Sequence, residues 1–111
     1  MNERRELLPG TLEMLILQTL IRGPQHGYAI ARHIRQVSEE VLQVEEGSLY
    51  PALQRLLRDG LVVAEWGISA RNRKVRTYRV TADGAARLER EVTEFDRLLA
   101  GIARVMRPAE S

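Results

Sequence analysis

Hydrophobic residues recur every three or four positions along the first part of the chain, which is the spacing of a helix with one buried face. The first predicted helix runs from Leu12 to Arg22, with Thr11 as its N-cap and Gly23-Pro24 at its end. A second helix is predicted from Tyr28 to Ser38. The hydrophobic residues at 41–44 are too few for a helix, and we expect at most a short strand there.

A third helix is predicted to open near Gly47-Ser48, with Ser48 at or near the cap, and to end at Asp59-Gly60. Pro51 limits where it can begin, because proline costs little in the first turn of a helix but breaks a hydrogen bond further inside. One stripe of this helix faces the core and consists of Leu49, Leu53, Leu56 and Leu57. The remaining faces carry Ser48, Tyr50, Pro51, Gln54, Arg55 and Arg58. A DNA-recognition helix needs this division into a packed side and a donor-rich side, although an ordinary surface helix has it too.

Two β-rich segments follow, Leu61–Ile68 and Val75–Val80, joined by a polar turn over Ser69–Arg73. Three helices followed by strand, turn and strand is the order of a winged helix-turn-helix, in which the hairpin forms the wing. Between residues 71 and 79 the hairpin has no acidic residue and carries Arg71, Arg73, Lys74, Arg76 and Arg79. Most charge runs are only solvated surface, but cations on a hairpin tip can also contact phosphates or enter the minor groove. The position of this run after a three-helix unit favours DNA.

A final helix is predicted to begin at Thr81 as its cap, with Asp83 in the first turn, where the helix dipole favours an acid. Its hydrophobic residues are separated alternately by three and four positions, the a/d seam of a coiled coil: Ala85, Leu88, Val92, Phe95, Leu99, Ile102 and Met106. Because the first three helices already enclose a small core, we expect this seam to form a homodimer rather than to fold back on its own domain. The expected dimer contacts are Leu88, Val92, Phe95, Leu99 and Ile102, joined by Leu7, Leu8 or Leu12.

Composition describes a single globular domain, since the 111 residues are 44% hydrophobic and 29% charged, with a net charge of +2. We divide the chain into a winged helix-turn-helix over residues 1–80, a dimerisation helix over 81–106 and a frayed tail over 107–111. The absence of cysteine excludes disulfides, thiolate chemistry and Cys-based zinc sites. The N-terminus lacks the pattern of a signal peptide, and no segment is apolar for the ~20 residues that cross a bilayer. We therefore expect a cytoplasmic protein with no membrane partner.

Catalytic and metal chemistry find no support in the sequence. His26 and His33 have no carboxylate or cysteine beside them at ligand spacing, so we expect no metal site and no cofactor. No phosphate-binding glycine loop and no nucleophile with a base can be named, so we expect no catalytic residue and no enzyme activity. Trp66, the sole tryptophan, is expected to pack on the first wing strand, with stacking on a ligand as the weaker alternative.

These motifs resemble the PadR family of bacterial transcription regulators over roughly residues 10–100, nearly the whole chain. The strings that carry the resemblance are Gly27-Tyr28-Ala29-Ile30, Gly47-Ser48-Leu49-Tyr50-Pro51-Ala52-Leu53, Arg55-Leu56, Asp59-Gly60-Leu61-Val62 and the run from Arg73 to Thr81, with Gly84 entering the last helix. The resemblance implies a homodimeric winged-helix repressor that binds inverted-repeat operators and is often released by a small-molecule or stress signal. The short C-terminal part resembles the subgroup with a single C-terminal helix.

Carried over by position, the resemblance assigns Tyr28, Ser48, Tyr50 and Pro51 to the DNA-facing helix-turn-helix, and Arg71, Arg73 and Lys74 to the wing. Glu45 and Glu46 depart from the family pattern, because two carboxylates beside phosphate oppose binding unless they turn away. A second departure is that only Phe95 is aromatic in the last helix, whereas some relatives bind a flat ligand there between aromatic rings.

The expected protein is therefore mainly α with a small β-hairpin, a winged helix-turn-helix plus a C-terminal dimerisation helix, and it binds duplex DNA as a sequence-specific regulator. The third helices of the dimer would enter successive major grooves about one helical turn apart. The expected DNA contacts are Tyr28, Ser48, Tyr50, Pro51, Gln54, Arg55, Arg71, Arg73, Lys74 and Arg76. A winged helix whose basic wing docks on an acidic protein partner is the alternative.

Overall fold

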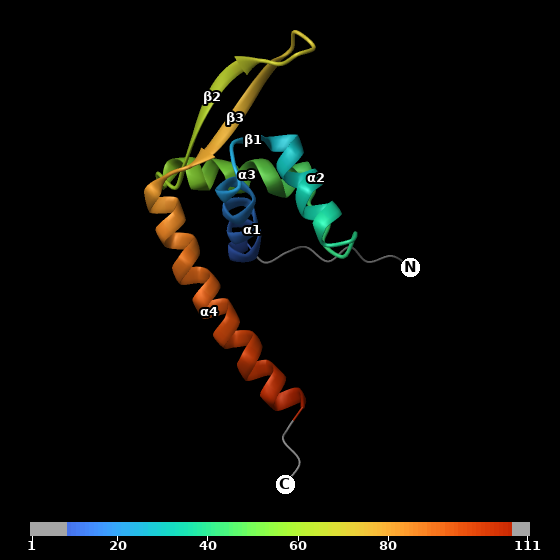
Figure 1. The fold of residues 1–111 in the computed structure, drawn as a ribbon, viewed down its shortest axis with the longest axis vertical. Coiled ribbons are helices and arrows are strands. Elements are labelled where there is room, and N and C mark those ends of the chain that lie inside the picture. Colours follow the sequence, from blue (N-terminus) through green and yellow to red (C-terminus); the bar gives the residue numbers. More distant parts are fainter. Residues whose placement is uncertain (1–8, 108–111) are drawn as a thin grey trace.

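The computed structural model describes residues 9–107, over which the chain forms four helices and a small antiparallel sheet (Figure 1). The elements in chain order are α1 (Pro9–Ile21), β1 (Gln25–His26), α2 (Gly27–Val37), α3 (Glu46–Arg58), β2 (Val62–Ile68), β3 (Lys74–Val80) and α4 (Ala82–Met106). The fold is the predicted winged helix, mainly helical with a hairpin as its wing. The predictions for Leu7, for Leu8 and for the tail beyond residue 107 lie outside the described residues.

Helix α1 is the centre of the core. It is hydrophobic almost all round, which is the composition of a helix that is covered on several sides. Ile16, Leu17 and Leu20 are fully buried, and α1 packs against α2, α3, β3 and α4. The buried hydroxyl of Thr19 donates to the carbonyl of Leu15 at 2.9 Å, so this polar group is satisfied within the helix. The other elements are therefore held in place by one helix that they share.

The sheet has three strands in the order β1-β3-β2, one more than the predicted hairpin. The additional strand consists of Gln25 and His26, which pair with Tyr78 and Thr77 of β3 as the chain passes from α1 to α2. Strands β2 and β3 pair in register from Val62 opposite Val80 to Ile68 opposite Lys74. Val62 and Tyr78 anchor the base of the wing in the core, and the rest of the hairpin projects from the body (Figure 1).

The predicted cap of the last helix is confirmed. The Thr81 hydroxyl accepts a hydrogen bond from the Gly84 amide at 3.0 Å and donates one to the Gly60 carbonyl at 2.8 Å. Gly84 is buried against the Leu61 carbonyl oxygen, which a Cβ atom would overlap. Thr81 and Gly84 therefore join the end of the wing, the end of α3 and the start of α4 in one tight junction.

Helix α4 packs on the body only along its first turns. Leu88 is 6% exposed and belongs to the core, and Val92 packs against that core from the outside. At this end the seam therefore does fold back on its own domain, contrary to the prediction that it would serve a homodimer instead. Beyond Val92, α4 leaves the body and extends away from it (Figure 1). Within residues 9–107 we find no helix whose length and apolar character would suit a membrane span.

Two predicted helix caps are wrong. Thr11 does not cap α1, because it lies inside a helix that already includes Pro9. Ser48 does not cap α3 either, because the Ser48 and Leu49 amides both bond to the Glu45 carbonyl, at 3.0 and 2.8 Å, and Glu45 is the cap. Pro51 consequently lies beyond the first turn, and burial of the stripe on the opposite side of α3 outweighs the hydrogen bond that proline cannot make.

Residues 41–44 form no strand but belong to the connection between α2 and α3. Leu42 and Val44 pack against the core from this connection, while Val41 is exposed. Their hydrophobic character therefore reflects contact with the helices and not pairing in the sheet.

Candidate nucleic-acid interface

A groove of about 400 Å³ lies between the start of α2, the side of α3 and the inner face of the wing. Five predicted DNA contacts from three separate elements line it: Tyr28, Tyr50, Gln54, Lys74 and Arg76. The groove therefore combines aromatic rings, an amide and two cations in one place. In the sequence these residues are separated by up to about half the length of the chain. Such a set of donors beside two cations suits the edge of a duplex and its phosphates.

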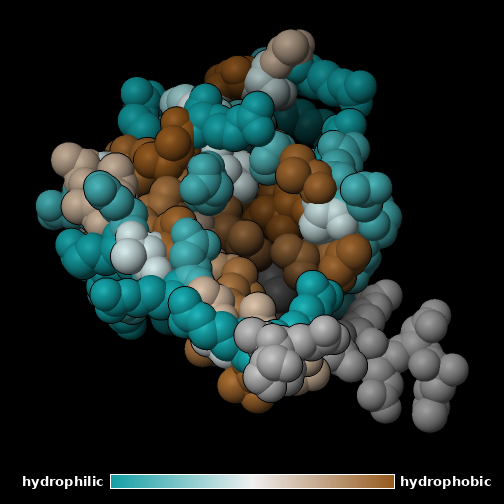
Figure 2. Space-filling model, turned by 60° about the horizontal axis from the view of Figure 1, so that its bottom comes forward, coloured by the Kyte–Doolittle hydropathy of each residue, from teal (hydrophilic) through white to brown (hydrophobic). Residues whose placement is uncertain are grey.

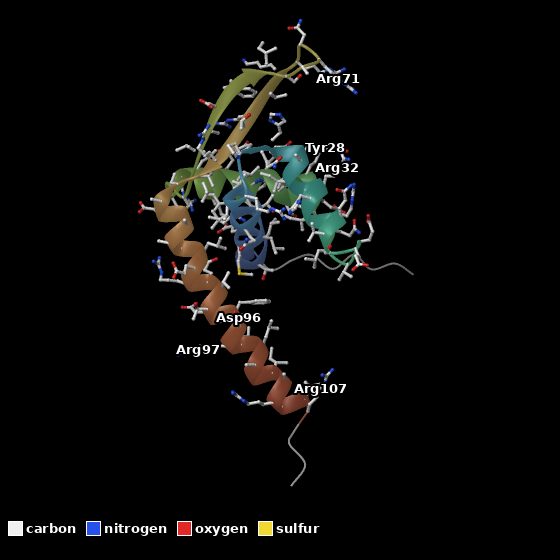
Figure 3. The ribbon with its side chains drawn as sticks, viewed as in Figure 1. Tyr28, Arg32, Arg71, Asp96, Arg97 and Arg107 are labelled. Carbon is white, nitrogen blue, oxygen red and sulfur yellow. The ribbon has the colours of Figure 1, made fainter. Side chains whose placement is uncertain are left out.

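Tyr50 is held against the beginning of α2. A Cβ atom at Gly27 would lie 3.1 Å from the Cε1 atom of Tyr50, so glycine allows the tyrosine ring to approach the helix start closely. Tyr28, the next residue, points outward from α2 and is exposed (Figure 3). The two sequence strings that opened the second and third predicted helices thus meet in one site.

The outer side of α3 presents Ser48, Pro51 and Gln54, all of them exposed. Arg55 lies on another side of the helix. Its Nε donates to the Oε1 atom of Glu13 on α1 at 2.6 Å, so the structure does not bring it together with the residues of the groove. This ion pair is partly buried and connects α3 directly to the central helix.

The wing ends in a tight turn that exposes its cations. The Ser69 amide donates to the Arg73 carbonyl at 2.8 Å, and Asn72 adopts a left-handed backbone with φ of 58°. Asparagine tolerates this conformation better than most residues. Arg71 and Arg73 are exposed in this turn, with Arg71 at the far end of the wing (Figure 3).

Trp66 is not the packing residue that the sequence suggested, because it is 60% exposed and stands outside the core. Its ring lies 4.8 Å from the Lys74 Nζ atom and 5.6 Å from the Arg76 Cζ atom. Arg32, which was not among the predicted DNA contacts, lies one turn after Tyr28 on the same side of α2 (Figure 3). The position of Arg32 beside Tyr28 could have been predicted from their i,i+4 spacing in the sequence. The position of Trp66 beside Lys74 and Arg76 depends on the pairing register of the two strands, which the sequence does not give.

The free half of α4 carries a second surface of a different kind. Phe95, Leu99 and Ile102 of the predicted dimer seam are 37%, 47% and 48% exposed, and further exposed hydrophobic residues stand beside them: Leu98, Val105 and Met106. A hollow of about 440 Å³ opens between α1 and α4, lined by Met14 and Phe95 among others. Seen with the lower end of the molecule forward, hydrophobic side chains gather around a hollow (Figure 2).

Groups of three or more histidine, aspartate or glutamate residues that could hold a metal ion do not occur among residues 9–107. The potential binding surfaces of this part of the chain are the basic groove and the hydrophobic side of α4.

A three-helix body with a cationic hairpin beside the exposed side of its third helix defines a winged helix-turn-helix, a DNA-binding fold. The family model described as the transcriptional regulator PadR-like family matches residues 16–90. The chain therefore belongs to the PadR-like family of transcriptional regulators.

Individual relatives agree with this assignment. The chain is 34% identical over 100 residues to Transcriptional regulator Rv3488 of Mycobacterium tuberculosis, covering 90% of this chain and 86% of the relative. A solved transcriptional regulator from Clostridium thermocellum has 27% identity and a TM-score of 0.79, with 86% of this chain and 89% of that chain covered. Bacillus subtilis PadR, solved in complex with operator DNA, shares the fold at 22% identity and a TM-score of 0.68, over 74% of this chain and 46% of that chain.

Proposed function

We propose that the chain is a homodimeric transcription regulator that binds an inverted-repeat operator in duplex DNA. It represses a nearby operon in the cytoplasm until a small-molecule or stress signal releases it. The observation that carries the proposal is the groove in which Tyr28, Tyr50, Gln54, Lys74 and Arg76 converge beside the exposed side of α3. A protein of the same fold has been solved in complex with operator DNA, which supports DNA binding as the use of this fold.

In this proposal α3 enters the major groove and the wing follows the backbone or the minor groove. Gln54 has the amide that recognises adenine in a bidentate manner, a contact that discriminates by about 1–3 kcal/mol. In this arrangement Tyr28, Ser48, Tyr50 and Pro51 would face the DNA backbone. Arg55 keeps further N–H donors besides the Nε that binds Glu13, so it too can donate to DNA.

The wing cations supply affinity that does not depend on sequence. Arg71 and Arg73 at the tip, with Lys74 and Arg76 in the strand, would neutralise phosphates and release counterions. This affinity falls steeply with salt, whereas contacts of α3 with base edges select the operator. The two elements therefore divide positioning and specificity between them.

The homodimer rests on the free half of α4, proposed as part of a dimerisation helix over residues 81–106. A single chain leaves Phe95, Leu99 and Ile102 exposed as a continuous hydrophobic side, and such a patch marks an interaction surface. A second copy is the occupant that an inverted repeat requires, because a two-fold site needs a two-fold protein. Leu88 and Val92, the other two proposed dimer contacts, already pack against the core of their own chain, so they can give only a small area to a second copy.

The hollow between α1 and α4 is where we place the effector. Its volume of about 440 Å³ lies in the range of small-molecule sites, and Met14, Phe95 and Leu98 give it a hydrophobic lining beside Glu91 and Glu94. Helix α1 also carries Glu13, which is paired with Arg55 of α3. A molecule in the hollow would therefore act on the recognition helix through α1.

A mobility-shift titration at two salt concentrations tests the proposal, with duplex DNA from upstream of the chain's own gene and a random duplex of equal length. We expect retention of both at low salt and of the upstream duplex at higher salt. Arg73→Ala should weaken binding of both duplexes about threefold to tenfold and lower the salt slope by about one. Arg90→Ala, an equal loss of charge at an exposed position of α4, is the matched control and should leave binding unchanged. Failure of the wild-type chain to bind either duplex at low salt would overturn the proposal.

A further inference from the structure

Trp66 and the two cations beside it share one face of the hairpin. The register sets Trp66 opposite Arg76, Ala64 opposite Tyr78 and Ile68 opposite Lys74. Residues that stand opposite each other in an antiparallel pair point to the same side of the sheet, as do residues two apart along a strand. The side chains of Trp66, Lys74, Arg76 and Tyr78 therefore form one row, which we call the cation row, and all four line the groove.

Aromatic rings hold both cations of the row. The Lys74 Nζ atom lies 4.8 Å from the centroid of the Trp66 ring, and the Arg76 Cζ atom lies 5.6 Å from it and 5.7 Å from the Tyr78 ring. These distances are within the ~6 Å over which a ring face attracts a cation. Trp66 contacts both cations, so it is the residue that keeps two like charges side by side.

The row lacks an anion. Within residues 9–107, neither Lys74 nor Arg76 forms an ion pair, although Arg79 of the same strand is paired with Glu65 at 3.5 Å. The Nε atom of Arg76 is buried and has no hydrogen-bond partner in this part of the chain. Two ordered cations without a carboxylate are suited to an anion from outside the chain.

We propose that Trp66 is a positioning residue of the wing, which holds Lys74 and Arg76 as a preformed clamp for one phosphate of the DNA backbone. This inference rests on the proposed DNA-binding function. It adds a role for Trp66, which positions the two cations and does not itself contact a base. Long cationic side chains normally lose rotamer freedom when they bind, and a ring that orders them beforehand removes part of that cost. Trp66 acts through its neighbours, so its removal weakens binding while both charges remain.

The clamp is tested on a random-sequence duplex at low salt, since a phosphate contact does not depend on sequence. Trp66→Leu should weaken binding about fivefold and reduce the salt slope, because the two cations no longer engage the backbone together. Trp66→Phe, which keeps a ring, should lose about twofold. Val63→Ala removes an exposed hydrophobic side chain from the other face of the same strand and is the matched control, with unchanged binding.

A double-mutant cycle separates positioning from direct contact. If Trp66 acts through Arg76 and Lys74, Trp66→Leu should have almost no further effect in the Arg76→Ala, Lys74→Ala background. Equal melting temperatures for the single variants and the wild type would show that the wing remains folded. Where Trp66→Leu lowers the melting temperature, the salt slope decides, because a loss of folded protein reduces the active fraction without changing the slope.

Two results would overturn the clamp and leave the proposed function standing: wild-type affinity of Trp66→Leu, or additive losses in the cycle. Loss of all duplex binding in the wild-type chain would instead refute the proposed function itself. The fluorescence of Trp66, the sole tryptophan, gives an independent signal. It should change when the wild type binds the duplex, and an unchanged spectrum at saturation would also count against the clamp.

Discussion

The wing and the free half of α4 both project from the core formed around α1, yet they expose opposite chemistry. The wing carries Arg71 and Arg73 in its turn and a row of ring-held cations along its inner face. The free half of α4 exposes Phe95, Leu99 and Ile102 along one side. These wing cations form no ion pair within residues 9–107, and these α4 side chains remain partly uncovered there.

This difference indicates what each projection binds. A hydrophobic side gains free energy when another hydrophobic surface covers it, at roughly 25 cal/mol per Å². A cationic hairpin gains when it displaces counterions from a polyanion. The same domain can therefore use α4 to meet its own copy and the wing to meet DNA, without competition between the two partners.

The largest expected effect comes from charging the hydrophobic side of α4. Replacing Leu99 and Ile102 together by aspartate should give a folded monomer, because these positions lie beyond the part of α4 that packs on the body. Operator affinity should fall on the order of 100-fold, since two half-sites would no longer be held by one molecule. Analytical ultracentrifugation and the mobility shift measure the two effects. Ala100→Asp, on another side of the same helix, is the control, and a dimeric double variant would contradict the contrast between the two projections.

A smaller effect is expected at the junction from which both projections leave the body. Gly84→Ala should lower the free energy of unfolding by about 2 kcal/mol or more, because the new Cβ atom overlaps the Leu61 carbonyl and lies 2.8 Å from Val80 Cγ2. Gly101→Ala, in the free half of α4, meets nothing within 4 Å and should stabilise the helix by up to ~1 kcal/mol. Urea denaturation measures both, and equal effects at the two glycines would show that the junction is not tight.

The smallest effect concerns the link between α1 and the recognition helix. Glu13→Gln weakens the partly buried pair with Arg55 and should cost about 1 kcal/mol of stability or less. Operator binding should weaken about threefold while binding of a random duplex changes little, because the wing is untouched. Glu89→Gln, at an exposed position of α4, is the control. Equal losses on both duplexes would contradict a specific role of this pair in holding α3.

Much of the fold was predictable because its signals are local. Hydrophobic stripes marked α1 to α4, and the polar turn between two β-rich segments marked the wing to within one residue at each strand start. The cap at Thr81 depends on a residue and an amide only three positions apart. The caps predicted at Thr11 and Ser48 were wrong because a capping side chain is only one way to satisfy a helix end, and in α3 the Glu45 carbonyl accepts the first hydrogen bonds instead.

The candidate site was predictable as a set of residues and not as an arrangement. Tyr50 and Gln54 were selected from the outer faces of the third helix and Tyr28 by the family resemblance, and the groove does unite them with Lys74 and Arg76. Arg55 was selected by the same reasoning, but its partner Glu13 lies 42 residues away in the chain. A helical pattern indicates only that a side chain is not on the buried stripe of its helix. A neighbouring helix can still contact such a side chain, as α1 contacts Arg55.

By itself, the sequence determined the succession of helices and strands, the cationic hairpin and the hydrophobic seam of the last helix, because each follows from residue types at fixed short spacings. Only the tertiary structure decided that Gln25 and His26 add a third strand, that Trp66 holds two cations, and that Leu88 is covered by its own body. These outcomes depend on which segments lie side by side. That is a property of packing around α1 and has no counterpart in local periodicity.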